Sequence, residues 1–307
     1  MAWLQLIRWK NLLIIFFTQL LAWYCVILPA RPIILDIGNF LLLSVSTLLI
    51  AAAGYIINDY FDIKIDTINR PNKMVLGKFI PRKQAIIAHI CLNAVAVILA
   101  ALLAAKAHHL HWLGLQLTCI LLLWFYSTHF KRQFMSGNIV IALLTAFTIL
   151  TLVVYEPIVS FHPNAIVGSL PFLVLCLYAY FSFMLTWMRE IVKDMEDYKG
   201  DAMEGCTTMP IKWGLQASVI FTFVLGALSL LPLLFAIPAL YQAHFEILSL
   251  YILVGIALPL AGWCLYLGRK ATSAHYAMAS RILKLIMISG VFSLLIYYFQ
   301  IYINHGI

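Results

Sequence analysis

The chain of 307 residues is 64% hydrophobic and 10% charged, which excludes a disordered chain, a collagen-like fibre and an ordinary soluble enzyme. Lysine and arginine outnumber aspartate and glutamate by 20 to 12, yet no aromatic-rich basic module of the nucleic-acid-binding type is present. Basic residues retained on the cytoplasmic side of a membrane explain the surplus, so we expect no nucleic acid partner. The six cysteines are scattered without a CxxC pair and predict neither a zinc site nor a disulfide framework.

Nine apolar stretches are each long enough to cross a bilayer, which takes about 20 residues. They predict an all-α integral membrane protein with one domain over residues 1–307 and no separate soluble domain. The stretch that begins at Leu12 is interpreted as a retained helix because further spans follow it and no convincing signal-peptide cleavage site appears. The predicted spans are 12–29, 39–58, 84–105, 112–130, 138–156, 165–188, 215–238, 245–267 and 284–303.

The loops between these spans divide the basic residues unequally. Only Arg31 and Lys106 fall on one side of the predicted membrane, and the other 18 fall on the side of the N-terminus. This bias predicts that the N-terminus is cytoplasmic and the C-terminus is outside. We therefore expect a protein of the inner or plasma membrane whose two long loops, after the second and sixth spans, face the cytoplasm.

Those two loops carry nine of the 12 acidic residues, and both contain carboxylates at i, i+3 and i+7. On a helix this spacing places three like charges on one face, where they repel one another and lose hydration beside the membrane. Solvated helix ends would explain a single cluster, but not the same spacing twice. Mg²⁺ removes the repulsion, since it takes oxygen ligands and is commonly held by carboxylates together with substrate phosphates. The two clusters are Asp59, Asp62 and Asp66, preceded by Asn58, and Asp194, Asp197 and Asp201.

With these motifs, the sequence resembles the UbiA superfamily of intramembrane prenyltransferases, which have nine helices and Asp-rich motifs after the second and sixth. The resemblance implies transfer of a prenyl group from an allylic diphosphate to a lipophilic acceptor, with Mg²⁺ bridging the motifs to the diphosphate. It implies Asn58, Asp59, Asp62, Asp194, Asp197 and Asp201 as the Mg²⁺ and diphosphate residues, with Asp66 completing the first motif.

Basic residues near the motifs extend the resemblance. Arg70 and Lys73 lie in a run similar to the family's D-x-x-N-R-P-x-R, with Lys73 where arginine is more usual. Tyr126 and Lys131 are similar to the family's YxxxK pair but stand one residue further apart. We expect the cations Arg70, Lys73, Lys131, Arg189 and Lys193 to neutralise the departing diphosphate.

The acceptor is the least determined part of the prediction. The basic run 69–83 is similar to geranylgeranylglycerol-phosphate geranylgeranyltransferase members, and its cations suit an acceptor with its own phosphate. We favour such an acceptor over an aromatic one, 4-hydroxybenzoate or a naphthoate, while basic loops are expected on this side in any case. Prenyl chain length and oligomeric state are not predicted.

Two other functions compete. Intramembrane acids mark ion pathways in transporters, but these acids lie at helix ends and not at mid-depth. A CDP-alcohol phosphotransferase also uses clustered aspartates, but its characteristic D-G-x-x-A-R run is missing.

Aromatic faces can stabilise an allylic cation, although aromatics at helix ends also form ordinary membrane-interface belts. Candidates for the cavity lining are Tyr55, Tyr60, Phe61, Trp124, Tyr126, Tyr178, Phe181 and Trp187. The histidines at 108, 109 and 111 are interpreted as a solvated external turn, His129 as structural, and Glu156 as an external helix end.

Overall fold

The computed structural model describes residues 1–69, 74–159, 166–269 and 272–305. These residues form helices, and the only extended pairing among them is an isolated bridge between Leu76 and Ile80. The α-helices are α1 (Ala2–Leu6), α2 (Trp9–Ala22), α3 (Ile37–Phe61), α4 (Ile63–Asn69), α5 (Arg82–Lys106), α6 (Leu113–Thr128), α7 (Ser136–Tyr155), α8 (Ile166–Glu196), α9 (Tyr198–Met203), α10 (Met209–Gln242), α11 (Glu246–Ile252), α12 (Leu258–Leu267) and α13 (Ser273–His305). Short 3₁₀ or π turns lie between them: η1 (Trp23–Ile27), η2 (Leu28–Ala30), η4 (Leu110–Trp112), η5 (Phe130–Arg132), η6 (Pro157–Val159) and η7 (Leu253–Ala257).

Nine stretches of helix in the described residues are long and apolar enough to cross a membrane, which confirms the predicted all-α fold with nine spans. Several spans extend beyond the predicted bounds, and the seventh runs from Met209 to Gln242 and not from 215 to 238. The sixth continues past position 188 to Glu196, and the ninth begins at Ser273 and not at position 284. The charged residues Arg189, Glu190, Lys193 and Asp194 therefore lie on the last turns of α8 and not in a loop.

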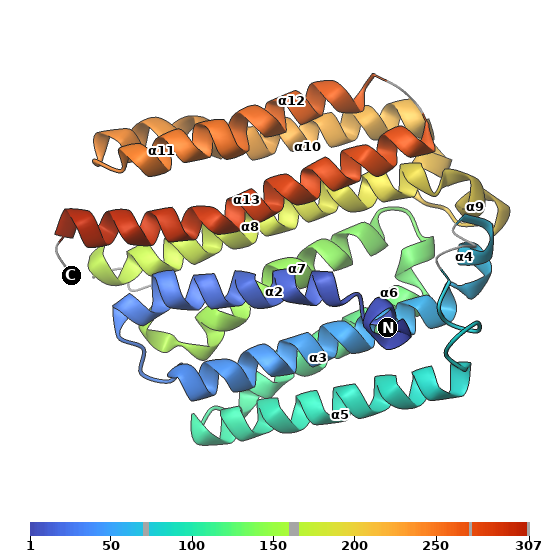
Figure 1. Cartoon of the computed structure of the whole chain (residues 1–307), viewed down its shortest axis with the longest axis horizontal. Helices are drawn as coiled ribbons and strands as arrows, with labels where there is room; N and C mark the ends of the chain where they lie inside the picture. Colours follow the sequence, from blue (N-terminus) through green and yellow to red (C-terminus); the bar gives the residue numbers. More distant parts are fainter. Residues whose placement is uncertain (70–73, 160–165, 270–271, 306–307) are drawn as a thin grey trace.

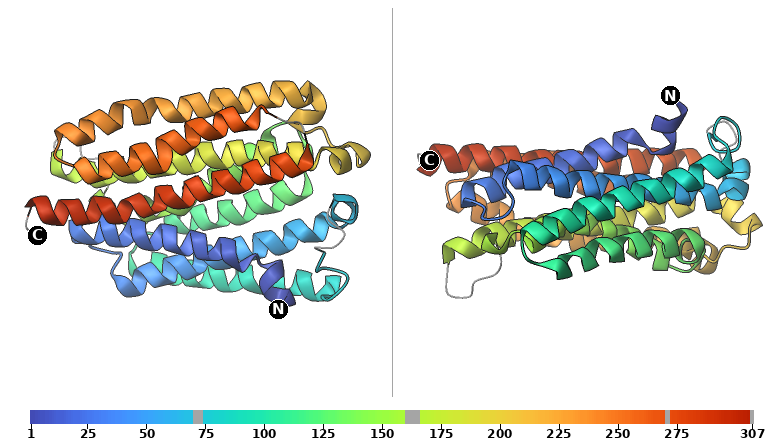
Figure 2. Two further views of the ribbon diagram at one scale, coloured as in Figure 1. Left: turned by 45° about the horizontal axis from the view of Figure 1, so that its top comes forward. Right: turned by 90° about the horizontal axis from the view of Figure 1, so that it is seen from below.

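The spans run side by side along one long axis, with the short helices α4 and α9 at one end (Figure 1). The N-terminus lies at that end and the C-terminus at the opposite end, as an odd number of spans requires (Figures 1 and 2). Helices far apart in sequence become neighbours, because α13 packs on both α8 and α2, and α3 packs between α5 and α6. Which end faces the cytoplasm stays a prediction.

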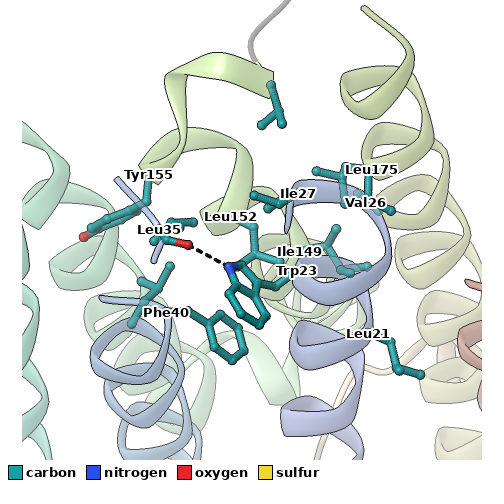
Figure 3. Close-up of a cluster of buried hydrophobic side chains, with 14 of the residues drawn as sticks. Leu21, Trp23, Val26, Ile27, Leu35, Phe40, Ile149, Leu152, Tyr155 and Leu175 are labelled. Carbon is teal, nitrogen blue, oxygen red and sulfur yellow. Dashed lines mark hydrogen bonds between the residues drawn. The ribbon is translucent and has the colours of Figure 1, made fainter. Parts of the chain in front are cut away.

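The end of the bundle away from α4 and α9 has a core fixed by aromatic packing (Figure 3). The Trp23 indole stacks on Phe40 with ring centroids 4.7 Å apart, and its Nε1 donates a 2.8 Å hydrogen bond to the Leu35 carbonyl. This bond satisfies a buried polar group of an otherwise apolar cluster. The packing ties the first span to the start of the second.

Glu156, at the C-terminal end of α7, strengthens the same region. Its side chain is fully buried and accepts three backbone N–H bonds of 2.8 to 3.1 Å from the turn at 33–35. The prediction of a helix end at Glu156 is confirmed, but the sequence did not show that this carboxylate is buried and accepts hydrogen bonds from a neighbouring loop.

Candidate active site

A cavity of about 300 Å³ lies between α2, α3, α6, α7, α8 and α13. Its polar mouth is at the end of the bundle that carries α4 and α9, and its described lining includes members of both aspartate clusters. The cavity continues between apolar and threonine side chains to Gln116 on α6, ten residues before Tyr126 on the same helix. At 1.5 Å per residue this is a depth of about 15 Å, enough for several isoprenoid units of a prenyl tail.

Each aspartate motif spans a break between a long helix and a short one. Asp62 ends α3 with φ −88° and ψ 0°, and Asp197 lies between α8 and α9 with φ −91° and ψ 7°. Both leave the α-helical region at the middle carboxylate of the motif. Neither motif lies on one continuous helix, because its middle carboxylate follows the end of the long helix and its last carboxylate, Asp66 or Asp201, lies on the short one.

In the first cluster, the Asp62 carboxylate is buried and already paired. Asn58 Nδ2 donates a 2.8 Å hydrogen bond to Asp62 Oδ2, and the Lys131 ammonium forms an ion pair with the same oxygen. Asp59 is 2.6 Å from an Arg8 guanidinium nitrogen. The described lining of the cavity includes Asn58, Asp62 and Asp66 but not Asp59.

Lys131 lies in a turn that packs closely on a glycine of α7. After α6 ends at Thr128, the turn η5 brings Lys131 back toward the cavity, so the extra residue between Tyr126 and Lys131 does not remove either from the site. The turn packs directly on α7 at Gly137, where an added Cβ would lie 2.9 Å from Lys131 Cα. Burial lowers the pKa of Lys131, but the nearby Asp62, with Tyr126, raises it above its ordinary value, which keeps the ammonium charged at neutral pH.

In the second cluster, the Asp194 carboxylate has a neutral hydrogen-bond partner. Asp194 accepts a 2.8 Å hydrogen bond from the neutral amide of Asn138, and it lies close enough to Asp201 and Glu190 for their charges to repel. Asp194, Asp197 and Asp201 all line the cavity, and Asp201 is buried. The neighbouring Cys206 carries a neutral thiol, since burial raises its pKa to about 11.

The predicted cations divide into those the structure describes and those it does not. Arg189 and Lys193 line the cavity, one helical turn apart on α8, and both pair with Glu190, at 3.2 Å and 2.5 Å. Arg70 and Lys73 lie outside the described residues.

Four charged residues of the described cavity lining were missed by the sequence analysis: Arg8, Arg132, Glu190 and Lys284. Of the eight aromatic candidates, Tyr55 and Tyr126 belong to the described lining and the other six do not. His129 is hydrogen-bonded to its neighbour Thr128 and also lies outside the lining. The charge of Arg8 and its place next to the first span were visible in the sequence, but its proximity to Asp59 depends on tertiary packing.

The donor set at the mouth fits Mg²⁺. It consists of carboxylate and amide oxygens, and the buried Asn58 Oδ1 has no hydrogen-bond partner. Within the described residues, no three acidic, histidine or cysteine side chains already surround one point. A cation held here would therefore take its remaining ligands from water and a substrate phosphate, which is the usual arrangement for Mg²⁺.

Comparison with known proteins identifies the family. Residues 13–298 match the model of the UbiA prenyltransferase family. The chain belongs to this family. Among curated relatives, the digeranylgeranylglyceryl phosphate synthase of Thermococcus sibiricus is 37% identical over 183 residues, 58% of this chain and 59% of the relative. That of Methanothermobacter thermautotrophicus is 33% identical over 220 residues, 70% of this chain and 71% of the relative.

Solved structures agree in fold along the whole chain. A structure described as that of digeranylgeranylglyceryl phosphate synthase in membranes has a TM-score of 0.63 and 25% identity, covering 97% of both chains. A UbiA homologue from Archaeoglobus fulgidus bound to GPP and Mg²⁺ has a TM-score of 0.61 and 14% identity, covering 96% of this chain and 99% of the homologue. The second likeness concerns the fold alone.

Proposed function

We propose that the protein transfers a prenyl group from an allylic prenyl diphosphate to the hydroxyl of a lipid acceptor that carries its own phosphate, of the geranylgeranylglyceryl phosphate type. The observation that carries the proposal is the cavity itself. It joins two clusters of oxygen ligands at its mouth to an apolar channel of about 15 Å, which matches a substrate with a diphosphate head and an isoprenoid tail.

The proposed Mg²⁺ and diphosphate residues are Asn58, Asp62, Asp194, Asp197 and Asp201, with Asp66 beside them. Asp59, which the sequence also predicted, pairs with Arg8 outside the described lining, so we propose that it orients Arg8. Bound Mg²⁺ would supply positive charge that stabilises the diphosphate as it leaves. Lys131 and Lys193 would add fixed cations at the same end of the cavity, where a low-dielectric environment strengthens their effect.

In the proposed reaction, the allylic carbon–oxygen bond breaks and the diphosphate leaves with the electron pair. An ether bond forms between that carbon and the acceptor oxygen, and the hydroxyl proton passes to the released diphosphate or to water. Tyr55 and Tyr126 present aromatic surface near the polar mouth of the cavity, and such surface can stabilise an allylic cation without reacting with it. The apolar walls below them exclude competing water.

The phosphate-bearing acceptor is supported by the curated relatives, which carry the name digeranylgeranylglyceryl phosphate synthase. We further propose, from the bias of basic residues, that the mouth of the cavity opens toward the cytoplasm. The single membrane domain over 1–307 is part of the same proposal.

The direct test is an assay of the purified full-length protein with geranylgeranyl diphosphate and Mg²⁺. Geranylgeranylglyceryl phosphate and 4-hydroxybenzoate are offered in parallel, and product and released diphosphate are both measured. Each arm is repeated with EDTA and then with excess Mg²⁺ restored, which controls for damage by the chelator.

EDTA-sensitive prenylation of the glyceryl phosphate lipid supports the proposal. Product only with 4-hydroxybenzoate overturns the acceptor assignment but not prenyl transfer. If neither acceptor yields product or releases diphosphate, the proposed reaction is wrong.

A further inference from the structure

The charges around the mouth of the cavity are sorted by sign. The aspartate clusters lie where α3 and α4 meet α8 and α9. A group of cations lies on the adjoining wall, where α2, α8 and α13 pack together (Figure 1). This group, called here the basic wall, consists of Arg8, Arg189 and Lys284, with the amide of Asn11 between them.

Fewer acids than cations occupy this region. Asp59 pairs with Arg8, and the single carboxylate of Glu190 is shared by Arg189 and Lys193. Lys284 has only a neutral partner, since its Nζ donates a 2.6 Å hydrogen bond to Asn11 Oδ1 and no carboxylate of the described residues lies within ion-pair distance. The four cations of this region, Arg8, Arg189, Lys193 and Lys284, therefore share two carboxylates, those of Asp59 and Glu190.

The basic wall also holds an unused donor. The Nε of Arg189 is buried and has no hydrogen-bond partner, although the guanidinium contacts Glu190 through another nitrogen. A buried donor without a partner costs free energy unless a ligand satisfies it. An anion in front of Arg189 would do so and would also offset the surplus positive charge.

Arg8 is held rigidly enough to take part. It stands at the break between α1 and α2 with φ 51°, a left-handed conformation that is uncommon outside glycine. Its guanidinium lies 4.9 Å from the centre of the Tyr55 ring and 2.6 Å from Asp59. These contacts orient the planar donor group toward the cavity that Tyr55 also lines.

We propose that Arg8, Arg189 and Lys284 bind the phosphate monoester of the acceptor lipid, at a subsite separate from the aspartate clusters that take the diphosphate. Arg189 is thereby assigned to the acceptor, whereas the sequence predicted that it neutralises the diphosphate. This inference rests on the function proposed above. A phosphate monoester carries between one and two negative charges near neutral pH, which matches the surplus of two cations better than the single charge of an aromatic carboxylate. Arginine and lysine are also the side chains that bind phosphate oxygens best.

The test compares Lys284→Gln with Arg281→Gln. Arg281 lies three residues earlier on α13, is exposed, and is not part of the described cavity lining, so its variant controls for the loss of one positive charge on the same helix. Acceptor KM, donor KM and the preference for geranylgeranylglyceryl phosphate over geranylgeranylglycerol are measured with each full-length protein.

For Lys284→Gln we expect acceptor KM to rise at least about tenfold, the effect of one lost charge-assisted hydrogen bond, and the preference for the phosphorylated acceptor to fall by a similar factor. Donor KM should stay within about twofold of the wild-type value, because the diphosphate is held elsewhere. Lys284→Arg should restore most of the preference, and Arg281→Gln should behave as wild type. Arg8→Gln is a second variant expected to raise acceptor KM.

Equal loss with phosphorylated and dephosphorylated acceptors, or an equal rise in donor and acceptor KM, would overturn the subsite. Inorganic phosphate tests whether a free ion and the lipid phosphate share the site. If inorganic phosphate competes with the acceptor in the wild-type protein and this competition is lost in Lys284→Gln, the result supports a common subsite. If inhibition by phosphate is the same in that variant, the result contradicts it.

A binding measurement separates this proposal from the proposed reaction. Thermal unfolding of the detergent-solubilised protein is followed with geranylgeranylglyceryl phosphate but without a donor. Stabilisation that depends on Lys284 supports the subsite even if no prenyl transfer is found. If wild-type protein and Lys284→Gln are stabilised equally, or neither is, the subsite is wrong whatever the reaction.

Discussion

The two aspartate clusters have the same spacing and nearly the same backbone geometry, but different partners. Asp62 and Asp197 each stand between a long helix and a short one with almost equal dihedral angles. Asp62 is paired with the ammonium of Lys131, whereas Asp194 in the second cluster accepts its hydrogen bond from the neutral Asn138 amide. The Asp62 carboxylate is thus compensated by a cation of the protein in direct contact, and the Asp194 carboxylate is held by a neutral group and faces the charges of Asp201 and Glu190.

This difference has an energetic consequence. Removing one partner of a buried aspartate–cation pair lowers stability, because the remaining charge is then left without compensation. Carboxylates that repel one another lower stability until a cation binds. Substitutions of Asp62 and Asp194 should therefore have similar effects on turnover but different effects on stability.

The largest combined effect is expected for Asp62→Ala. It removes a proposed metal ligand, so kcat/KM should fall by about 10³-fold, the upper range for loss of one electrostatic group. It also leaves the Lys131 ammonium without its carboxylate partner. Because the Lys131 side chain is 30% exposed, we expect a destabilisation of about 2 kcal/mol, below the range for a fully buried pair. Prenyl transfer and thermal unfolding in detergent measure the two effects.

The double variant Asp62→Ala with Lys131→Met controls for the stranded charge. It should regain stability but not activity. If both variants unfold at the wild-type temperature, Lys131 is not a structural partner of Asp62.

Asp194→Ala should cause a comparable loss of activity without loss of stability. We expect kcat/KM to fall by about 10²- to 10³-fold. The unfolding temperature without Mg²⁺ should stay near the wild-type value, because removal of a repelling carboxylate offsets the loss of the hydrogen bond from the buried Asn138 amide.

Thermal unfolding of wild-type protein and Asp194→Ala is also measured with Mg²⁺ and inorganic diphosphate. A ligand at about 100 times its Kd stabilises a protein by about 2.7 kcal/mol. Wild-type protein should gain this stabilisation and the variant should lose most of it. Equal stabilisation of both proteins would remove Asp194 from the proposed Mg²⁺ residues.

A smaller effect is expected when Lys131 is displaced and not removed. In Gly137→Ala the new Cβ would lie 2.9 Å from both Lys131 Cα and the Phe130 carbonyl oxygen, so the turn η5 must move. We expect donor KM to rise by about tenfold, in proportion to one weakened charge contact with the diphosphate. Gly262→Ala is the matched control, since its Cβ would meet nothing within 4 Å on the helix α12. Equal kinetics of the two variants would show that the close contact at Gly137 does not position Lys131.

Much of the fold could be predicted from the sequence because hydropathy and charge bias are strong signals in membranes. All nine spans were found, since each is an apolar run bounded by charged or turn residues. The end of the sixth span was missed because polar residues such as Lys193 face the interior of the bundle there, where the helix continues although hydropathy falls. The start of the ninth span was missed because the turns before position 284 contain polar residues such as His275 and Arg281.

The site was predicted in part, for a similar reason. Repeated spacing marked the aspartates, but spacing alone does not reveal a break in a helix, and the regular pattern suggested one face where the backbone turns. Arg8 and Lys284 are single charges near helix ends and resemble ordinary interface residues. Only packing of α2 against α13 brings them to one wall of the cavity.

Asp59 gives the last test of the comparison. It belongs to the first aspartate motif by its spacing, but it contacts Arg8 of the basic wall. Its Oδ1 is 2.6 Å from Arg8, and it is not part of the described cavity lining. We therefore expect Asp59→Asn to lower kcat/KM by only about tenfold, through loss of one charged contact that orients Arg8. The loss should appear mainly in acceptor KM, since Arg8 is proposed to hold the acceptor phosphate. A fall near 10³-fold in kcat, as expected for Asp62→Ala, would instead make Asp59 a metal ligand, as its position in the motif predicts, and would show that the diphosphate draws it away from Arg8.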